Sequence, residues 1–147
     1  MAARYFALRE AESLIPAVEK AIRHAIRVKA DYEQVEGELN KHAQRIQMMG
    51  GSRINRDEIM ELRQRQETLS SLLREAIEAI QSFGCQVKDL DIGLIDFPTL
   101  YKGEEVLLCW KLGERGIAWW HGLEEGFGGR KLIDDEFIAG HRGDSTN

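Results

Sequence analysis

The residues best suited to chemistry gather around His121, in the last third of the chain. His121 ends an aromatic run, and Glu125 follows four residues later. Asp96 lies between two apolar residues in a strand-like stretch. Imidazole and carboxylate groups together bind divalent metal ions or exchange protons, although this spacing matches no zinc signature. Asp96, His121 and Glu125 are therefore candidate metal ligands. The alternative is a structural His121 whose ring nitrogens are satisfied by neighbours, with Asp96 exposed to solvent.

A glycine-rich segment after Glu125 is a candidate site for a small anionic ligand. It reads Gly126-Phe127-Gly128-Gly129-Arg130. Glycine leaves backbone amides accessible and a guanidinium pairs with phosphate or carboxylate, so Gly128 and Arg130 are candidate ligand contacts. Trp120 is a candidate stacking surface. The alternatives are a simple turn with Arg130 in an ion pair, and tryptophans that belong to the core.

The register of the last hairpin decides which side chains share a face of the predicted sheet. Three strand-like runs, 94–97, 105–112 and 117–121, favour an antiparallel meander whose first strand ends at Pro98. An even-length loop is favoured and places Leu108 opposite His121, with Cys109 opposite Trp120. An odd loop with Gly116 in a bulge would place Cys109 opposite His121. In the favoured register Cys109 faces away from His121, so it is interpreted as a small buried hydrophobe rather than a nucleophile.

Two long helical patterns must carry this region. The first begins near Leu8–Ala11 without a capping side chain at Ala7, and Pro16 is expected to kink it or to split off its first turns. Gly50-Gly51-Ser52 ends it. Asn55 then fits an N-cap with Glu58 in a capping box, and Gly84 terminates the second helix. The short connection makes the helices antiparallel neighbours.

These elements predict an α+β fold, a long antiparallel helical hairpin with a small antiparallel β-sheet packed at its open end. We expect one domain over residues 1–139, with the hairpin over 5–84 and a β-rich head over 85–139. Leu14, Ile15 and Val18 extend beyond the hairpin and should be covered by the head. Residues 140–147 are expected to form a disordered tail in which His141 takes no part.

The helices also favour self-association. A two-helix hairpin buries one stripe per helix, and several apolar residues lie off that stripe. We expect them to form a homodimer with a second hairpin: Ile26, Val28, Val35, Leu72 and Ile77.

Composition narrows the function classes further. The net charge of −5 and the pI near 5.4 argue against a nucleic-acid partner, which requires clustered positive charge. No apolar run is long enough for a membrane span or a signal peptide, so a cytoplasmic location is expected. Cys85 and Cys109 are far apart and are expected to be free thiols.

The motifs of the head and the start of the first helix resemble a known bacterial family, domain of unknown function 2203. The resemblance rests on 93–98 (GLIDFP), 106–114 (VLLCWKLGE), Trp120-His121, 125–130 (EGFGGR) and 6–16 (FALREAESLIP). It implies a small cytosolic protein and assigns no activity, cofactor or catalytic residue. The leading hypothesis is a self-associating binding module without enzymatic chemistry. The alternative is a protein that binds a divalent metal or a small anion at Asp96, His121, Glu125 and Arg130.

Overall fold

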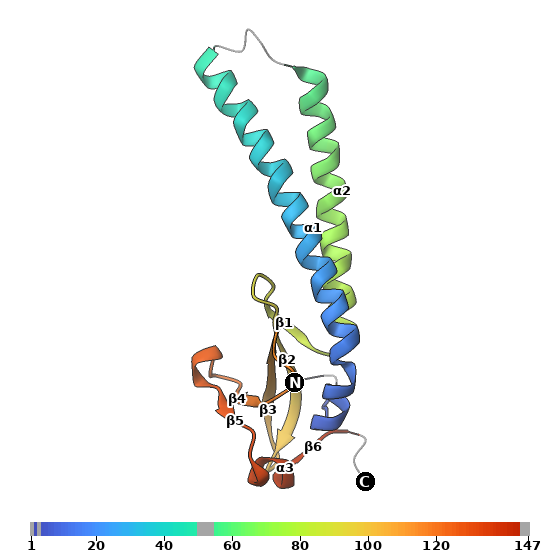
Figure 1. Cartoon of the computed structure of the whole chain (residues 1–147), viewed down its shortest axis with the longest axis vertical. Helices are drawn as coiled ribbons and strands as arrows, with labels where there is room; N and C mark the ends of the chain where they lie inside the picture. Colours follow the sequence, from blue (N-terminus) through green and yellow to red (C-terminus); the bar gives the residue numbers. More distant parts are fainter. Residues whose placement is uncertain (1, 3, 50–54, 145–147) are drawn as a thin grey trace. The chain divides into compact units, whose positions relative to one another are not determined.

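The computed structural model describes residues 2, 4–49 and 55–144 and divides the chain into two compact units (Figure 1). One unit, Arg23–Ile77, is helical. The other contains the chain up to Ile22 and from Glu78 onward, and it holds the whole β-sheet. The fold is therefore α+β, as the sequence predicts.

The helical unit is formed by parts of two long helices, α1 (Leu8–Met49) and α2 (Arg56–Gln81), which lie side by side in Figure 1. Asn55 caps α2 as predicted, because its Oδ1 accepts a hydrogen bond from the Glu58 N–H at 3.0 Å. The expected helix end at Gly50–Ser52 lies outside the described residues. Within the described part of the chain, no helix combines the length and the hydropathy that crossing a membrane requires.

The seam between α1 and α2 corrects one part of the dimer prediction. Val28 and Val35 are buried in a cluster with Leu69 of α2, so the prediction that both valines lie off the seam is wrong. The half-buried members of the same seam are Tyr32, Leu39, Leu62 and Leu73. Along α1 the sequence 28, 32, 35, 39 keeps steps of three and four residues, so the valines belong to the stripe that meets α2.

Among the residues that the structure describes, the sheet has six strands where the sequence predicts three. Their order is β1-β2-β3-β4-β5. Strand β6 also pairs with β2, at residues of β2 beyond those that pair with β1. All strand pairs are antiparallel. The strands are β1 (Gln86–Asp89), β2 (Leu94–Tyr101), β3 (Glu104–Lys111), β4 (Trp119–Gly122), β5 (Lys131–Leu132) and β6 (His141–Arg142). A short 3-10 helix, η1 (Phe127–Gly129), lies between β4 and β5, and a helix, α3 (Asp135–Gly140), precedes β6. The additional strands are only two to four residues long, too short to carry a visible alternation of apolar residues.

Strand β2 continues through Pro98, so the predicted strand end at this residue is wrong. The Pro98 carbonyl accepts a hydrogen bond from the Phe6 N–H at 2.7 Å. In an antiparallel strand the nitrogen and the carbonyl of one residue point to the same edge. The missing N–H of Pro98 therefore faces Phe6, and the ladder between β2 and β3 is unaffected.

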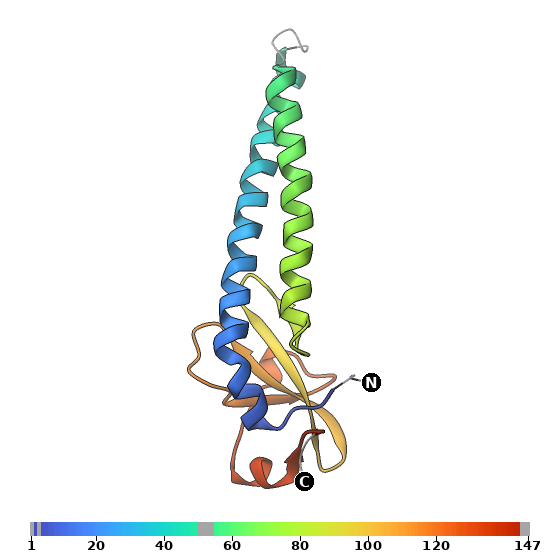
Figure 2. The same cartoon turned by 90° about the vertical axis from the view of Figure 1, so that its right-hand side faces the viewer.

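The first turns of α1 cover one face of the sheet (Figure 2). Phe6 and Phe97 are fully buried and pack edge to face, with ring centroids 5.2 Å apart. Of the three residues predicted to extend beyond the hairpin and to be covered, Ile15 and Val18 are buried in this unit and Leu14 is half-buried. Helix α1 is unbroken at Pro16, so the expectation that Pro16 splits off its first turns is wrong.

The register between β3 and β4 differs from both predicted alternatives. His121 lies opposite Leu107, Trp120 opposite Leu108 and Trp119 opposite Cys109. The favoured even loop paired Leu108 with His121 and Cys109 with Trp120. Pairing between β3 and β4 instead stops at Cys109 and Trp119. Because β3 continues to Lys111, an irregular connection of seven residues, 112–118, joins the two strands, and no tight turn fixes the register. One consequence follows for the faces of the sheet: Cys109 and His121 are on the same face.

The C-terminal segment, expected to be a disordered tail from Gly140, is ordered through Asp144. The Asp144 N–H donates to the Tyr5 carbonyl, and Thr99 Oγ1 donates to the Arg142 carbonyl. Gly143 approaches the backbone so closely that a Cβ would lie 2.3 Å from the Ala7 nitrogen. Residues 145–147 lie outside the described residues.

His141 takes part in this segment by capping α1. Ala7 offers no capping side chain, and the His141 Nε2 accepts a hydrogen bond from the Leu8 N–H at 2.9 Å. Glu10 Oε1 accepts from the Ala7 N–H at 3.0 Å, as the distal residue of a capping box does. His141 Nδ1 then carries the proton and donates to the Ile138 carbonyl at 2.8 Å. The expectation that His141 is uninvolved is therefore wrong.

Replacing His141 by alanine removes this acceptor and should lower the free energy of unfolding by about 1 kcal/mol, the usual cost of a lost helix cap. Urea unfolding followed by far-ultraviolet circular dichroism measures the change. His24→Ala, at an exposed position of α1, is the matched control and should not destabilise the chain. Equal stability of the two variants would contradict the capping role.

Candidate functional site

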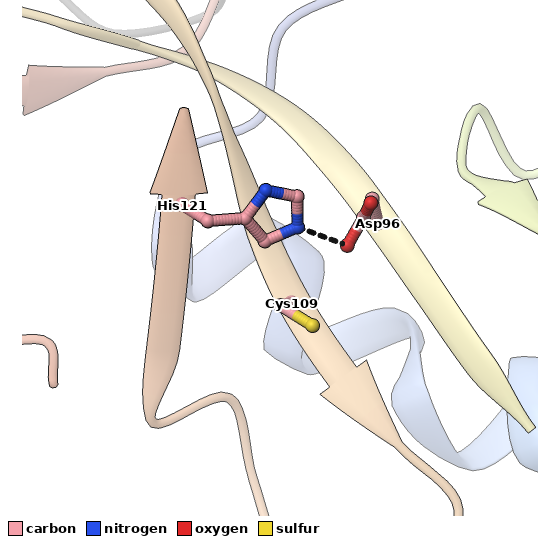
Figure 3. Close-up of side chains that lie close together, drawn as sticks. All are labelled: Asp96, Cys109 and His121. Atoms are coloured by element: carbon pink, nitrogen blue, oxygen red, sulfur yellow. Dashed lines mark hydrogen bonds and ion pairs between the residues drawn. The ribbon is translucent and has the colours of Figure 1, made fainter. Parts of the chain in front are cut away.

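Three buried side chains converge on the face of the sheet that α1 does not cover. They are Asp96 of β2, Cys109 of β3 and His121 of β4, which Figure 3 shows reaching across β3 toward Asp96. Their exposed fractions are 1%, 0% and 4%. The cross-strand pairing places them there, because Asp96 lies opposite Cys109 and the next strand adds His121 on the same face. One ligand-type atom from each lies within 4.8 Å of the others.

The hydrogen bonds of His121 require one proton beyond those of a neutral imidazole and a carboxylate. Its Nδ1 lies 2.8 Å from the Gly122 carbonyl, which only accepts, so Nδ1 carries a proton. Its Nε2 lies 3.1 Å from Asp96 Oδ1. The Nε2–Oδ1 bond forms only when a second proton lies between the two atoms. The pair therefore exists as imidazolium and carboxylate or as imidazole and carboxylic acid.

Cys109 is a protonated thiol at neutral pH. Burial, with the nearby Asp96 carboxylate, raises its pKa to about 12, and Arg130 offsets this only in part. Both nitrogens of His121 are already occupied by Gly122 and Asp96, so no imidazole nitrogen is available to take the thiol proton. The arrangement does not form a cysteine–histidine nucleophilic pair.

Glu125 shares a cavity with Asp96 and His121 but does not join their cluster. The cavity has a volume of about 190 Å³, and all three residues line it. Glu125 Oε1 accepts a hydrogen bond from the Gly122 N–H at 2.9 Å and pairs with the Lys131 ammonium. Lys131 and then the Gly122 N–H hold the pKa of the Glu125 carboxyl below its usual value. Of the three residues chosen from the sequence, two are in contact and the third lies on the cavity wall.

The three predicted ligand contacts do not share one place. Trp120 lies on the opposite face of the sheet, stacked on Phe137 with ring centroids 4.9 Å apart. Gly128 is in η1, with open space where a Cβ would stand. Arg130 is nine-tenths buried, and its Nη2 donates to both carboxylate oxygens of Glu114 at 2.9 and 2.8 Å. Its guanidinium also lies over the Trp119 ring. This is the ion pair that the sequence analysis gave as the alternative for Arg130.

Cys109 is the member of the cluster that sequence reasoning set aside. Asp96, Cys109 and His121 share a face only if the β3–β4 loop has the parity of the odd alternative. That alternative was available from the sequence, although its register is two residues away from the observed one. The run of apolar residues in β3 carries no alternation that would decide the parity.

The raised thiol pKa values predict a fall in stability at alkaline pH. Burial raises the pKa of Cys85 to about 11 and that of Cys109 to about 12, against about 8.5 in an unfolded chain. Above about pH 9 the unfolded chain binds fewer thiol protons than the folded chain, so stability decreases as pH rises. Each thiol contributes a slope of about 1.4 kcal/mol per pH unit until its folded pKa is reached.

Urea unfolding of the reduced protein between pH 8 and 11 in the presence of a chelator measures this slope. Cys109→Ala and Cys85→Ala should each remove one thiol's share. A pH dependence of Cys109→Ala parallel to that of the unsubstituted chain would show that the Cys109 thiol is not held protonated by the fold.

Comparison with known proteins supports the resemblance seen in the sequence. No curated protein and no solved structure shows a significant match to this chain. The family described as uncharacterized conserved protein (DUF2203) matches residues 4–133, which include α1, α2 and strands β1 to β5. The chain therefore belongs to the domain of unknown function 2203 family.

Proposed function

We propose that this protein binds a divalent transition-metal ion, with zinc as the best match, through Asp96, Cys109 and His121. The observation that carries the proposal is the convergence of one oxygen, one sulfur and one nitrogen ligand within 4.8 Å on a buried face. Thiolate and imidazole are ligands that zinc prefers, and a carboxylate commonly completes such a set.

The spacing of the nitrogen and oxygen ligand atoms suits a tetrahedral ion after a small adjustment. Zinc bonds of about 2.0–2.1 Å to nitrogen and oxygen separate those ligand atoms by about 3.3–3.4 Å. Nε2 of His121 and Oδ1 of Asp96 are 3.1 Å apart, so a widening of a few tenths of an ångström admits the ion. Three protein ligands leave the fourth coordination position available to water or a bound molecule.

The hydrogen bond from His121 Nδ1 to the Gly122 carbonyl supports the same proposal. It fixes the ring orientation and leaves Nε2 as the ligand nitrogen, which is the common arrangement of metal-bound histidine. A carboxylate and a thiolate neutralise the two charges of the ion, so the buried site carries no net charge. The proposal requires a reduced Cys109, and we therefore place the protein in the reducing cytoplasm.

Glu125, a candidate ligand in the sequence analysis, takes a different part in this proposal. Its carboxylate is held by Gly122 and Lys131, and it is not among the atoms that lie within 4.8 Å of one another. Glu125 then shapes the cavity beside the ion, and Cys109 supplies the third ligand.

The reduced protein should bind one cobalt(II) ion, used as a spectroscopic probe for zinc, and show a thiolate-to-cobalt charge-transfer band. Cys109→Ser should abolish that band and weaken binding about 100-fold or more, beyond the 10–100-fold effect of residues that only hydrogen-bond a ligand. Absorbance titration and competition with a chelator measure both quantities.

Cys85→Ser is the matched control for this experiment. Cys85 is the second buried cysteine of the same unit, and its thiol donates to the Ile80 carbonyl instead of joining the cluster. This variant should keep the charge-transfer band. Unchanged cobalt binding by Cys109→Ser, or no binding by the unsubstituted chain, would reject the metal site and leave His121 and Asp96 as a structural ion pair.

We also propose that α1 and α2 mediate a homodimer, the leading hypothesis of the sequence analysis. Its support is apolar side chains that α1 and α2 do not bury. Leu72 remains 41% exposed, and Ile26 and Ile77 are half-buried. Nearer the connection of the hairpin, the exposed apolar residues are Ile46, Met48, Met49 and Met60. A second copy of the chain presents the same residues and would cover them.

The dimer predicts a mass of 33.6 kDa by light scattering, twice the 16.8 kDa of one chain. Leu72→Glu should shift the population toward monomer, because it buries a charge in the interface. Ser71→Glu, at the adjacent exposed position, is the control and should remain dimeric if the interface is centred on Leu72. A monomeric mass for the unsubstituted chain at high concentration would reject the dimer.

A further inference from the structure

We infer that the cavity beside Asp96 and His121 binds a small monocarboxylate. Its carboxylate group would lie between the metal ion and the Lys88 ammonium, and its hydrocarbon part against apolar walls. The inference rests on the proposed metal site, because the fourth coordination position supplies one of the two contacts to the carboxylate.

The lining of the cavity matches such a ligand. Asp96 and His121 line it, so an ion held by them lies at its inner wall. The rest of the lining combines one cationic side chain with apolar ones: Lys88, Leu94, Leu107, Leu123 and Phe127, together with Glu125 and Gly126. Leu123 and Phe127 are 56% and 44% exposed although both border the cavity, and a bound hydrocarbon group would cover part of each.

The charges around the cavity favour an anion. Glu125 is paired with Lys131, and Asp96 with His121. For Lys88 no ion-pair partner is found among the residues that the structure describes. Lys88 stands at an irregular position of β1, where the register with β2 shifts between Val87 and Asp89. With a neutral metal site, Lys88 leaves one positive charge for the ligand to match.

The volume and the polar groups limit the ligand to a small, singly charged molecule. A cavity of about 190 Å³ is below the roughly 300–1,000 Å³ of pockets for drug-sized ligands. A cavity of this size suits a ligand of only a few non-hydrogen atoms, such as butyrate or isobutyrate. A phosphate group would call for more donors than one lysine. Arg130, the other cation predicted to hold an anion, is held by Glu114.

Isobutyrate titrated into the cobalt(II)-loaded protein tests the inference. As isobutyrate displaces the metal-bound water, the visible spectrum of cobalt should change, and the change should saturate as more isobutyrate is added.

Lys88→Gln should weaken isobutyrate binding about 10-fold or more, as loss of a contact to a charged group does, and should leave the cobalt affinity within about two-fold. Lys102→Gln, which removes an exposed lysine paired with Glu136, is the control. It should change neither the affinity for isobutyrate nor the affinity for cobalt. Isobutyramide, neutral and of the same shape, should bind about 10-fold more weakly or worse.

The outcomes separate this inference from the proposed function. If cobalt binds with its thiolate band but isobutyrate leaves the spectrum unchanged, the ligand assignment is overturned and the metal site stands. Equal effects of Lys88→Gln and Lys102→Gln on isobutyrate binding would also overturn it, because Lys88 would then not contact the carboxylate. If the unsubstituted chain binds no cobalt, both the metal site and the carboxylate pocket are rejected.

Discussion

A carboxylate buried in the middle of a sheet is the constraint on which the sheet-bearing unit depends. Asp96 is 1% exposed on β2, between the fully buried Ile95 and Phe97, and an unpaired charge there would cost several kcal/mol. His121 is its hydrogen-bonding partner, so β4 must pair with β3 in the register that brings the imidazole within reach. The Gly122 carbonyl then holds the ring in place. The hydrogen bond of one buried acidic side chain thus favours the observed register of a strand that no tight turn determines.

The proposed metal ion would take the place of protons that the same cluster holds in the metal-free chain. In the metal-free chain a proton lies between His121 and Asp96, and a second proton stays on the Cys109 thiol. A divalent ion that replaces both protons leaves the total charge of the site unchanged, which is the condition for exchange in a buried environment. The cavity reaches Asp96 and His121 but not Cys109, so the proposed ion would enter on the side of Asp96 and His121. Structural stability and the proposed metal binding would therefore depend on the same set of atoms.

Local patterns predicted what local physics determines. The strict spacing of apolar residues and the Asn55 cap were sufficient to predict helix α2. The sequence motifs were sufficient to predict that the chain belongs to the family. Asp96 and His121 were identified because their residue types are unusual in strands of apolar residues. The position of Cys109 depended on the parity of a loop, and the cap on α1 depended on His141, which is more than a hundred residues away in the sequence. Contacts of this kind arise from tertiary packing and have no signature within a short window of sequence.

The segment after the family match completes the other face of the sheet. The match ends at residue 133, and the following residues form α3 and β6. Phe137 of α3 is buried between Tyr101 and Trp120, with ring centroids 4.7 and 4.9 Å away. Trp120 is therefore committed to a stack inside the chain, which explains why a tryptophan next to His121 does not contribute to the cavity. Alternation along β4 divides two tasks between adjacent residues: His121 serves the polar cluster, and Trp120 anchors the C-terminal segment that caps α1.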